Sequence, residues 1–171
     1  MKGYIQVYTG DGKGKTTAAL GLALRAVGAG KKVLLVQFLK GRPSSEECAL
    51  SRLAPDITLK QYGRKRLILS KPQEKDIAKA QEGLKEVQKA LRSKHYDLII
   101  LDEINMAVYL KVLAVEDLLS LLQEKPENLE LVLTGRNAHP RVLEKADLVT
   151  EMKEIKHYYS RGVKARTGIE K

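Results

Sequence analysis

The chain has 171 residues, of which 43% are hydrophobic and 30% are charged, a balance typical of a globular protein. This length suits one domain, residues 1–171, that folds without disulfides or a structural metal. The single cysteine, Cys48, excludes an internal disulfide framework, and no apolar run approaches the roughly 20 residues that span a bilayer. No apolar leader with a cleavage site begins the chain, so we expect a cytoplasmic protein without a membrane partner.

The charge is strongly basic, with 31 Lys and Arg against 21 Asp and Glu, or +10 in total. An excess of this size points to an anionic partner such as a nucleic acid, a membrane surface or a polyphosphate. A lysine-rich surface that keeps the protein soluble accounts for the same number. Because the basic residues are spread along the chain, charge alone does not identify a partner.

Apolar segments alternate with helical patterns along the whole chain. Strands are predicted from apolar runs at residues 4–8, 33–39, 98–101, 129–133 and 148–152. Helices are predicted from apolar periodicity and end signals at residues 15–28, 74–94, 115–123 and 140–146. The least regular segments are residues 40–45, 62–71, 105–112 and the tail from Lys156. Ligands of open α/β sheets bind outside the carboxyl ends of strands, so these segments are where chemistry is expected.

A glycine-rich turn between the first strand and the first helix matches a phosphate-binding loop. Glycines let consecutive backbone N–H groups converge on phosphate oxygens, and the helix N-terminus adds partial positive charge. Lys15 supplies a full positive charge, and Thr9 stands where the usual pattern has its first glycine. The predicted nucleotide-binding residues are Gly10, Asp11, Gly12, Lys13, Gly14, Lys15, Thr16 and Thr17.

An acidic pair, Asp102 and Glu103, closes the third predicted strand, where P-loop proteins place the carboxylate that completes a Mg²⁺ site. The Thr16 hydroxyl is positioned to bind the same ion. With the alternating elements, these motifs predict an α/β fold of the P-loop NTPase type. We expect a RecA-like, mostly parallel sheet of five to six strands with helices on both faces.

An ordered set of further motifs then runs through the chain. They are residues 10–19 (GDGKGKTTAA), 36–41 (VQFLKG), 101–103 (LDE), 134–136 (TGR), 146–152 (ADLVTEM), 156–157 (KH), 162–165 (GVKA) and 168–170 (GIE). This set closely resembles the P-loop corrinoid adenosyltransferases, which act on cob(I)alamin or cob(I)yrinic acid a,c-diamide. The resemblance covers nearly the whole chain.

The resemblance implies transfer of the 5′-deoxyadenosyl group of ATP to the Co(I) centre of a reduced corrinoid, with release of triphosphate. A Co(I) corrinoid is itself a strong nucleophile, so the protein needs only to position the reactants and stabilise the leaving group. Lys13, Lys15 and Arg136 are assigned that stabilising role. Thr16 and Glu103, supported by Asp102, would bind Mg²⁺ or Mn²⁺. A flavin-type reductant that supplies Co(I) and a homodimeric assembly are also implied.

The predicted loop at residues 62–68 departs from some relatives, which carry a Phe and a Trp there to displace the lower ligand of the corrinoid. This chain has no Trp and reads Gly63-Arg64-Lys65-Arg66 instead. The cations either meet negative groups on the corrinoid or form a solvated basic loop. Among the histidines, His139 is expected to cap a helix, and His157 either lies near the substrate or is structural.

Two other functions use the same phosphate motif. One is a P-loop ATPase or kinase that acts at the γ-phosphate, and the other is a nucleic-acid-binding ATPase of RecA-like build. One Phe, seven Tyr and no Trp offer few stacking platforms for single strands, so nucleic acid is the less favoured partner.

Overall fold

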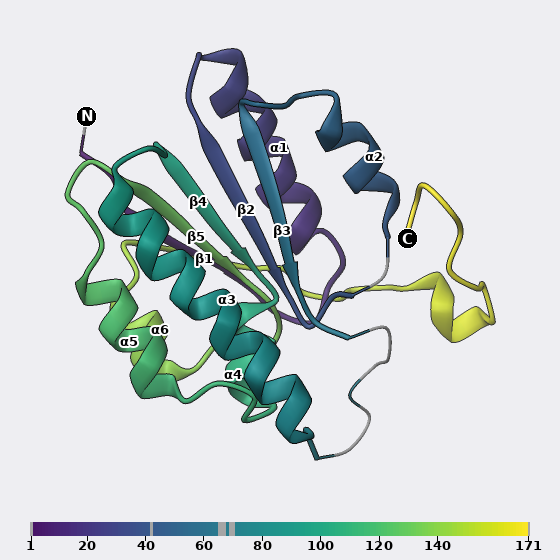
Figure 1. Ribbon diagram of the computed structural model, residues 1–171. Coiled ribbons are helices and arrows are strands. Elements are labelled where there is room, and N and C mark those ends of the chain that lie inside the picture. The colour runs from purple at the N-terminus through teal and green to yellow at the C-terminus, as the bar shows by residue number, and fades with distance from the viewer. Residues whose placement is uncertain (1, 42, 65–67, 69–70, 171) are drawn as a thin grey trace.

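The computed structural model describes residues 2–41, 43–64, 68 and 71–170 (Figure 1). Its strands are β1 (Ile5–Thr9), β2 (Val33–Phe38), β3 (Ile57–Tyr62), β4 (Leu98–Asp102), β5 (Glu130–Thr134) and β6 (Leu148–Glu151). Its helices are α1 (Lys15–Gly28), α2 (Ser45–Ser51), α3 (Glu74–Ser93), α4 (Ile104–Tyr109), α5 (Val115–Gln123) and α6 (Pro140–Leu143), followed by the 3-10 helix η1 (Tyr158–Arg161). Within the described ranges, no helix has the length and apolarity to cross a membrane.

The strands form one sheet in the order β3-β2-β4-β5-β1-β6, and every recorded pairing is parallel. The central strands β2 and β4 are buried along their whole length. Their unbroken apolar runs are typical of strands covered on both faces, because in such strands neither set of alternating side chains reaches water. The predicted mostly parallel sheet of five to six strands is confirmed, with six strands among the described residues.

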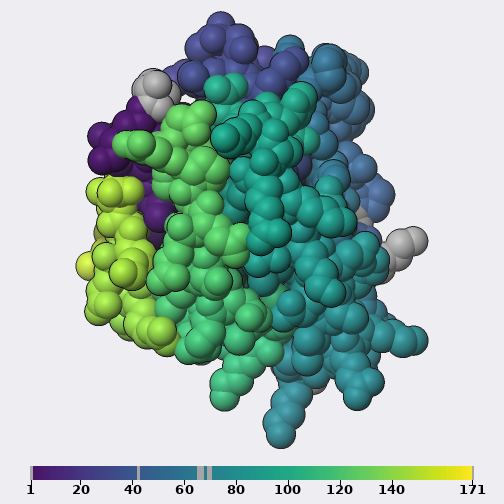
Figure 2. Space-filling view, turned by 60° about the vertical axis from the view of Figure 1, so that its left-hand side comes forward, coloured from purple at the N-terminus to yellow at the C-terminus, as the bar shows by residue number. Residues whose placement is uncertain are grey.

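Helices cover both faces of the sheet, as predicted. On one face α3, α4, α5 and α6 pack over a core that includes Leu84, Leu118 and Val142 (Figures 1 and 2). On the other face α1 and α2 pack over a smaller core built on Ala19 and Ala23. Small residues on α1 let that helix lie close to the strands, so the loop that precedes it is fixed against the sheet.

Three elements fall in segments for which no regular structure was predicted. The six-residue α4 lies inside the segment expected to be irregular, so that prediction is wrong there. The seven-residue α2 buries only Leu50, and β3 is an edge strand with intermediate exposure beyond Ile57. Each is too short or too weakly patterned to produce a clear apolar period.

The parallel arrangement brings the carboxyl ends of the strands to one edge of the sheet. Thr9 of β1, Asp102 of β4 and Thr134 of β5 lie at this edge, on three strands that are adjacent in space. All three strands continue into loops at that edge, where open α/β sheets bind their ligands. The predicted site residues are therefore gathered at one place by the topology.

Candidate nucleotide-binding site

The phosphate loop begins at the end of β1 and ends at Gly14, where α1 starts. Gly10 and Gly14 have φ angles of 93° and 119°, a left-handed region that glycine adopts without steric cost. No side chain caps the start of α1, and its first turn holds no acidic residue. The first N–H groups of the helix are thus directed at the loop with no local anion competing for them.

Met152, the residue that follows β6, braces the phosphate loop. The Gly12 N–H donates to the Met152 carbonyl oxygen at 2.6 Å, and the Met152 N–H donates to the Thr9 carbonyl oxygen at 2.8 Å. A Cβ at Gly12 would lie 2.7 Å from the same Met152 oxygen, so only glycine allows this approach. Sequence reasoning did not identify Met152 as a support of the loop, because only the fold brings it there.

The Lys15 side chain is buried within the loop that it serves. Its Nζ donates to the carbonyl oxygens of Gly10 at 2.6 Å and of Gly12 at 2.7 Å. Burial, followed by the nearby charge of Arg136, lowers the pKa of Lys15, while Glu103 and Asp11 oppose the shift. These two carbonyl oxygens hold the ammonium group inside the loop, and the oxygens of a bound phosphate could take their place as its partners.

The other predicted phosphate-binding side chains are open to solvent. Lys13 and Thr17 are exposed at the surface of the loop. Arg136, on the turn after β5, places its Nε 4.0 Å from an Asp11 carboxylate oxygen, and both side chains are largely exposed. An ion pair of this kind contributes little energy by itself, so the Arg136 guanidinium is free to turn toward an anion.

Asp102 is the centre of a buried hydrogen-bond cluster at the end of β4. Its Oδ1 accepts from the hydroxyls of Thr16 at 2.8 Å and Thr134 at 2.7 Å. Its Oδ2 accepts from the Gln37 side-chain amide at 3.1 Å. Both oxygens are therefore engaged by protein donors, and the carboxylate fixes the Thr16 hydroxyl at the mouth of the loop.

Glu103 follows directly and is held in an uncommon backbone conformation. Its φ of 60° is left-handed, which costs a non-glycine residue about 1 kcal/mol, and its N–H donates to the Thr134 hydroxyl at 3.0 Å. Burial and then the charge of Asp102 raise the pKa of Glu103, against the opposing effect of Lys15. A left-handed backbone and an unfavourable charge at one residue make this carboxylate a candidate functional group.

The oxygen donors at this place suit a hard divalent cation. The Thr16 hydroxyl and the Glu103 carboxylate are oxygen ligands of the kind that Mg²⁺ takes in small number together with phosphate oxygens and water. Among the described residues, no cluster of three or more His, Cys, Asp or Glu side chains could hold a metal alone. The residues thus fit a cation shared with a bound phosphate, and they do not form a closed protein cage.

Gln37 and Gln61 belong to the same cluster but were not predicted as site residues. The Gln61 amide donates to the Gln37 side-chain oxygen at 2.9 Å, and Gln37 in turn donates to Asp102. Gln37 is fully buried in an otherwise apolar strand. A lone amide inside such a strand is the sequence signal that could have identified it, since buried polar groups need partners.

The loop after β3 is only partly described. Lys65 and Arg66, two of the cations of the basic loop for which a corrinoid contact and a solvated surface were both considered, lie outside the described residues. Arg64 directs its guanidinium to the start of α3, where it donates to the Gln73 side-chain oxygen at 2.7 Å and lies 3.5 Å from Asp76. These contacts favour the interpretation that Arg64 supports the helix.

The two histidines considered in the sequence analysis, His139 and His157, both cap helices. His139 caps α6 by accepting from the Arg141 N–H at 3.3 Å, which confirms its expected role. His157 caps η1 in the same way, accepting from the Tyr159 N–H at 3.0 Å. His157 also lines a surface pocket together with Arg136, and its proximity to a substrate stays a prediction.

A phosphate loop at the start of a helix, a carboxylate at the end of β4 and an all-parallel sheet define a P-loop protein of RecA-like build. A solved structure titled as the RadB recombinase matches with a TM-score of 0.59 at 17% identity, over 91% of this chain and 77% of that one. At this identity the likeness concerns the fold alone, and it confirms the predicted architecture.

The sequence comparisons are more specific. Residues 1–170 match the family described as ATP:corrinoid adenosyltransferase BtuR/CobO/CobP. Proteins named corrinoid adenosyltransferase from Escherichia coli K12 and Pseudomonas aeruginosa are 38% and 36% identical over 99% of this chain and 86% and 84% of their own length. A Salmonella typhimurium protein named corrinoid adenosyltransferase CobA is 36% identical, again over 99% of this chain and 86% of its own length. The chain belongs to the ATP:corrinoid adenosyltransferase family.

Proposed function

We propose that the protein transfers the 5′-deoxyadenosyl group of ATP to the Co(I) centre of a reduced corrinoid. In this reaction the cobalt electron pair forms a bond to C5′ and the C5′–O bond breaks. Triphosphate leaves with that bond pair. Family membership supports this function over γ-phosphate transfer or a nucleic-acid-dependent ATPase.

The observation that carries the proposal at the atomic level is the buried Lys15 ammonium inside a glycine loop at a helix N-terminus. The leaving group carries several negative charges, and a fixed cation with preorganised N–H groups stabilises such a group without reorganisation. Lys13 and Arg136 are exposed at the rim of the loop and would add mobile positive charge. No side chain is required as a nucleophile, because the corrinoid supplies it.

A divalent cation, Mg²⁺ or Mn²⁺, would bind to Thr16 and Glu103. When bound it supplies positive charge against the phosphate oxygens. Asp102 would act by positioning the Thr16 hydroxyl, since its own oxygens already accept three hydrogen bonds. We further propose one catalytic domain over residues 1–171, a homodimeric state, a cytoplasmic location and a flavin-type reductant that delivers Co(I).

The test is to incubate the protein with ATP, Mg²⁺ and a chemically reduced corrinoid. The expected result is a light-sensitive Co–C bond, whose formation is monitored by absorption spectroscopy. One triphosphate should be released for each Co–C bond formed. Release of ADP or phosphate without a Co–C bond would instead establish one of the γ-phosphate functions. A variant with Lys89, an exposed lysine of α3, replaced by alanine serves as the matched control for substitutions in the loop.

A further inference from the structure

The turn that follows β5 carries Arg136 and is fastened to β1 by two hydrogen bonds. The Gly135 N–H donates to the Tyr8 carbonyl oxygen at 3.1 Å, and the Ala138 N–H donates to the Thr9 hydroxyl at 3.3 Å. Both acceptors lie at the end of β1, directly before the phosphate loop. The backbone of the turn therefore has a defined position beside the loop, although the Arg136 side chain is 52% exposed.

A buried amide on α4 provides a further attachment for the same turn. Asn105 is 1% exposed, and its Nδ2 donates to the Gly135 carbonyl oxygen at 3.3 Å. Gly135 has a φ of 127°, and a Cβ built on it would lie 3.2 Å from the Asn105 Cβ. Glycine at this position thus allows both the backbone conformation and the close approach of the amide.

The Asn105 amide is an unfavourable group to bury at this place. Its Oδ1 is buried and accepts no hydrogen bond within the described part of the chain. The buried neighbours of Asn105 on α4 are mostly apolar, among them Ile104 and Val108. A buried polar atom without a partner is destabilising, so an apolar side chain would suit this environment better. The hydrogen bond to Gly135 is what the amide supplies and an apolar side chain does not.

The Arg136 guanidinium lies close to the charged groups of the phosphate loop. Its Nε is 4.0 Å from an Asp11 carboxylate oxygen. After burial, the charge of Arg136 is the largest influence that lowers the pKa of Lys15. The two cations are therefore near enough to contact one bound polyphosphate together.

We propose that Asn105 is a positioning residue that directs Arg136 toward the phosphate loop. The Gly135 carbonyl group and the Arg136 nitrogen belong to one planar peptide unit, so a hydrogen bond that holds the carbonyl oxygen also holds the direction in which Arg136 leaves the turn. A cation held in place before binding loses less freedom when the anion arrives. The inference rests on the proposed function for the role of Arg136 at the triphosphate.

The test is a double-mutant cycle on the binding of inorganic triphosphate with Mg²⁺, measured by calorimetry without corrinoid. Asn105→Ala should weaken binding about three- to tenfold when Arg136 is present and should have no effect in the Arg136→Ala background. The same loss in both backgrounds would reduce Asn105 to a structural role and overturn the proposal. Wild-type affinity in either single variant would overturn it as well.

Two further variants separate positioning from stability. Val108→Ala removes volume from another buried residue of α4, so it should lower the urea midpoint and leave triphosphate affinity unchanged. Asn105→Leu keeps a side chain of similar shape without its polar atoms, and it should repeat the loss of affinity if the alanine variant does not fold. These measurements need no turnover, so a wild type that forms no Co–C bond would contradict the proposed function, whereas the role of Asn105 is decided by binding.

Discussion

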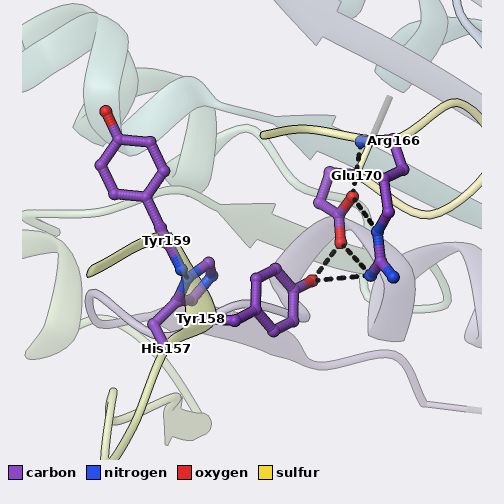
Figure 3. Close-up of polar contacts among 5 residues, drawn as sticks. All are labelled: His157, Tyr158, Tyr159, Arg166 and Glu170. Carbon is purple, nitrogen blue, oxygen red and sulfur yellow. Dashed lines mark hydrogen bonds and ion pairs between the residues drawn. The ribbon is translucent and has the colours of Figure 1, made fainter. Parts of the chain in front are cut away.

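The phosphate site and the tail after β6 are built in opposite ways. At the ends of β4 and β5, Asp102 and Thr134 are buried and connected by side-chain hydrogen bonds to Thr16 and Gln37. In the tail after β6 most residues are exposed, including Ile155 at 85%. The contacts among Tyr158, Arg166 and Glu170, which we call the tail clasp, join tail residues only to one another (Figure 3). In Figure 1 the tail projects away from the sheet, whereas the phosphate loop lies against it.

This difference separates a part of the protein with a fixed geometry, the phosphate site, from a part that can loosen on its own, the tail. A triphosphate has a fixed shape and high charge, which rigid N–H groups and a buried ammonium match best. The tail is ordered by its own contacts and is exposed, so it can loosen without unfolding the sheet. Substitutions in the phosphate site should therefore change turnover, metal dependence or stability, whereas a substitution in the tail should change local order alone.

The largest effect is expected from Lys15→Ala in the phosphate site. Without the ammonium the leaving group loses its main fixed charge, so turnover should fall by about 2–4 kcal/mol of transition-state free energy, or thirty- to a thousandfold. Steady-state triphosphate release measures this, with Lys89→Ala as the control. A Lys15 variant that keeps more than a tenth of wild-type turnover would remove the loop from the catalytic machinery.

The next effect concerns the support behind the metal site. Gln37→Leu deletes the donor to Asp102 and leaves the Gln61 amide without its acceptor, so the free energy of unfolding should fall by about 1–3 kcal/mol. We also expect half-saturation at a higher Mg²⁺ concentration, since Asp102 then holds Thr16 less firmly. Urea titration and a Mg²⁺ series check both, with exposed Gln123→Leu as the control. An unchanged Mg²⁺ series would limit Gln37 to a packing role.

Glu103→Gln should have opposite effects on stability and on function. Burial and Asp102 raise the pKa of Glu103, so at neutral pH folding must pay for an ionised carboxylate that glutamine does not carry. The variant should therefore melt higher at pH 7–8, by about 2–4 °C for each kcal/mol relieved. The gain should vanish as the pH falls below about 4.3, where the unfolded glutamate is also protonated. Metal-dependent ATP binding should weaken at pH 7–8, where the wild-type carboxylate is ionised, and a lower melting temperature at pH 8 would contradict the assigned cost of that charge.

The smallest effect on global stability is expected in the tail. The Arg166 and Tyr158 hydrogen bonds lower the pKa of Glu170 to about 2, so the tail clasp should persist as the pH falls below 4 and open only near pH 2. Glu170→Gln should leave the melting temperature within about 1 °C of wild type, because the tail clasp is exposed. Amide exchange and ring shifts of residues 157–161 should nevertheless report a looser tail. A large fall in melting temperature would show that the tail is part of the cooperative core.

The sequence predicted the parts of the fold whose signals are strong and local. The buried strands that begin at Val33 and Leu98 each open with four consecutive apolar residues, and the α3 helix repeats its apolar residues over 20 positions. Helices α2 and α4 are two turns or less, and in β3 the polar Lys60 and Gln61 stand together. Such elements owe their existence to packing on neighbours that are distant in sequence, which a local pattern does not contain.

The residues of the candidate site likewise fall into those that a local motif predicts and those that only the fold brings together. The phosphate loop and the Asp102-Glu103 pair were predicted because a short motif fixes their geometry. Asp102 as a hydrogen-bond centre, with Gln37 behind it, was not predicted, because four strands and α1 must meet before those side chains touch. The hydrogen bond between Gly12 and Met152 likewise depends on where β6 joins the sheet. Contacts between residues that are distant in sequence cannot be predicted from the spacing of residues along the chain.

The position of β1 has a consequence for the order in which the protein acquires its site during synthesis. The strand that carries the phosphate loop leaves the ribosome first, yet its two partners in the sheet, β5 and β6, are among the last elements made. Gly12 finds its backbone acceptor only once Met152 has emerged. Because such long-range parallel pairings form late, the nascent chain should acquire nucleotide affinity only near the end of translation. Chains stalled before residue 152 should therefore carry the complete phosphate motif and fail to bind ATP.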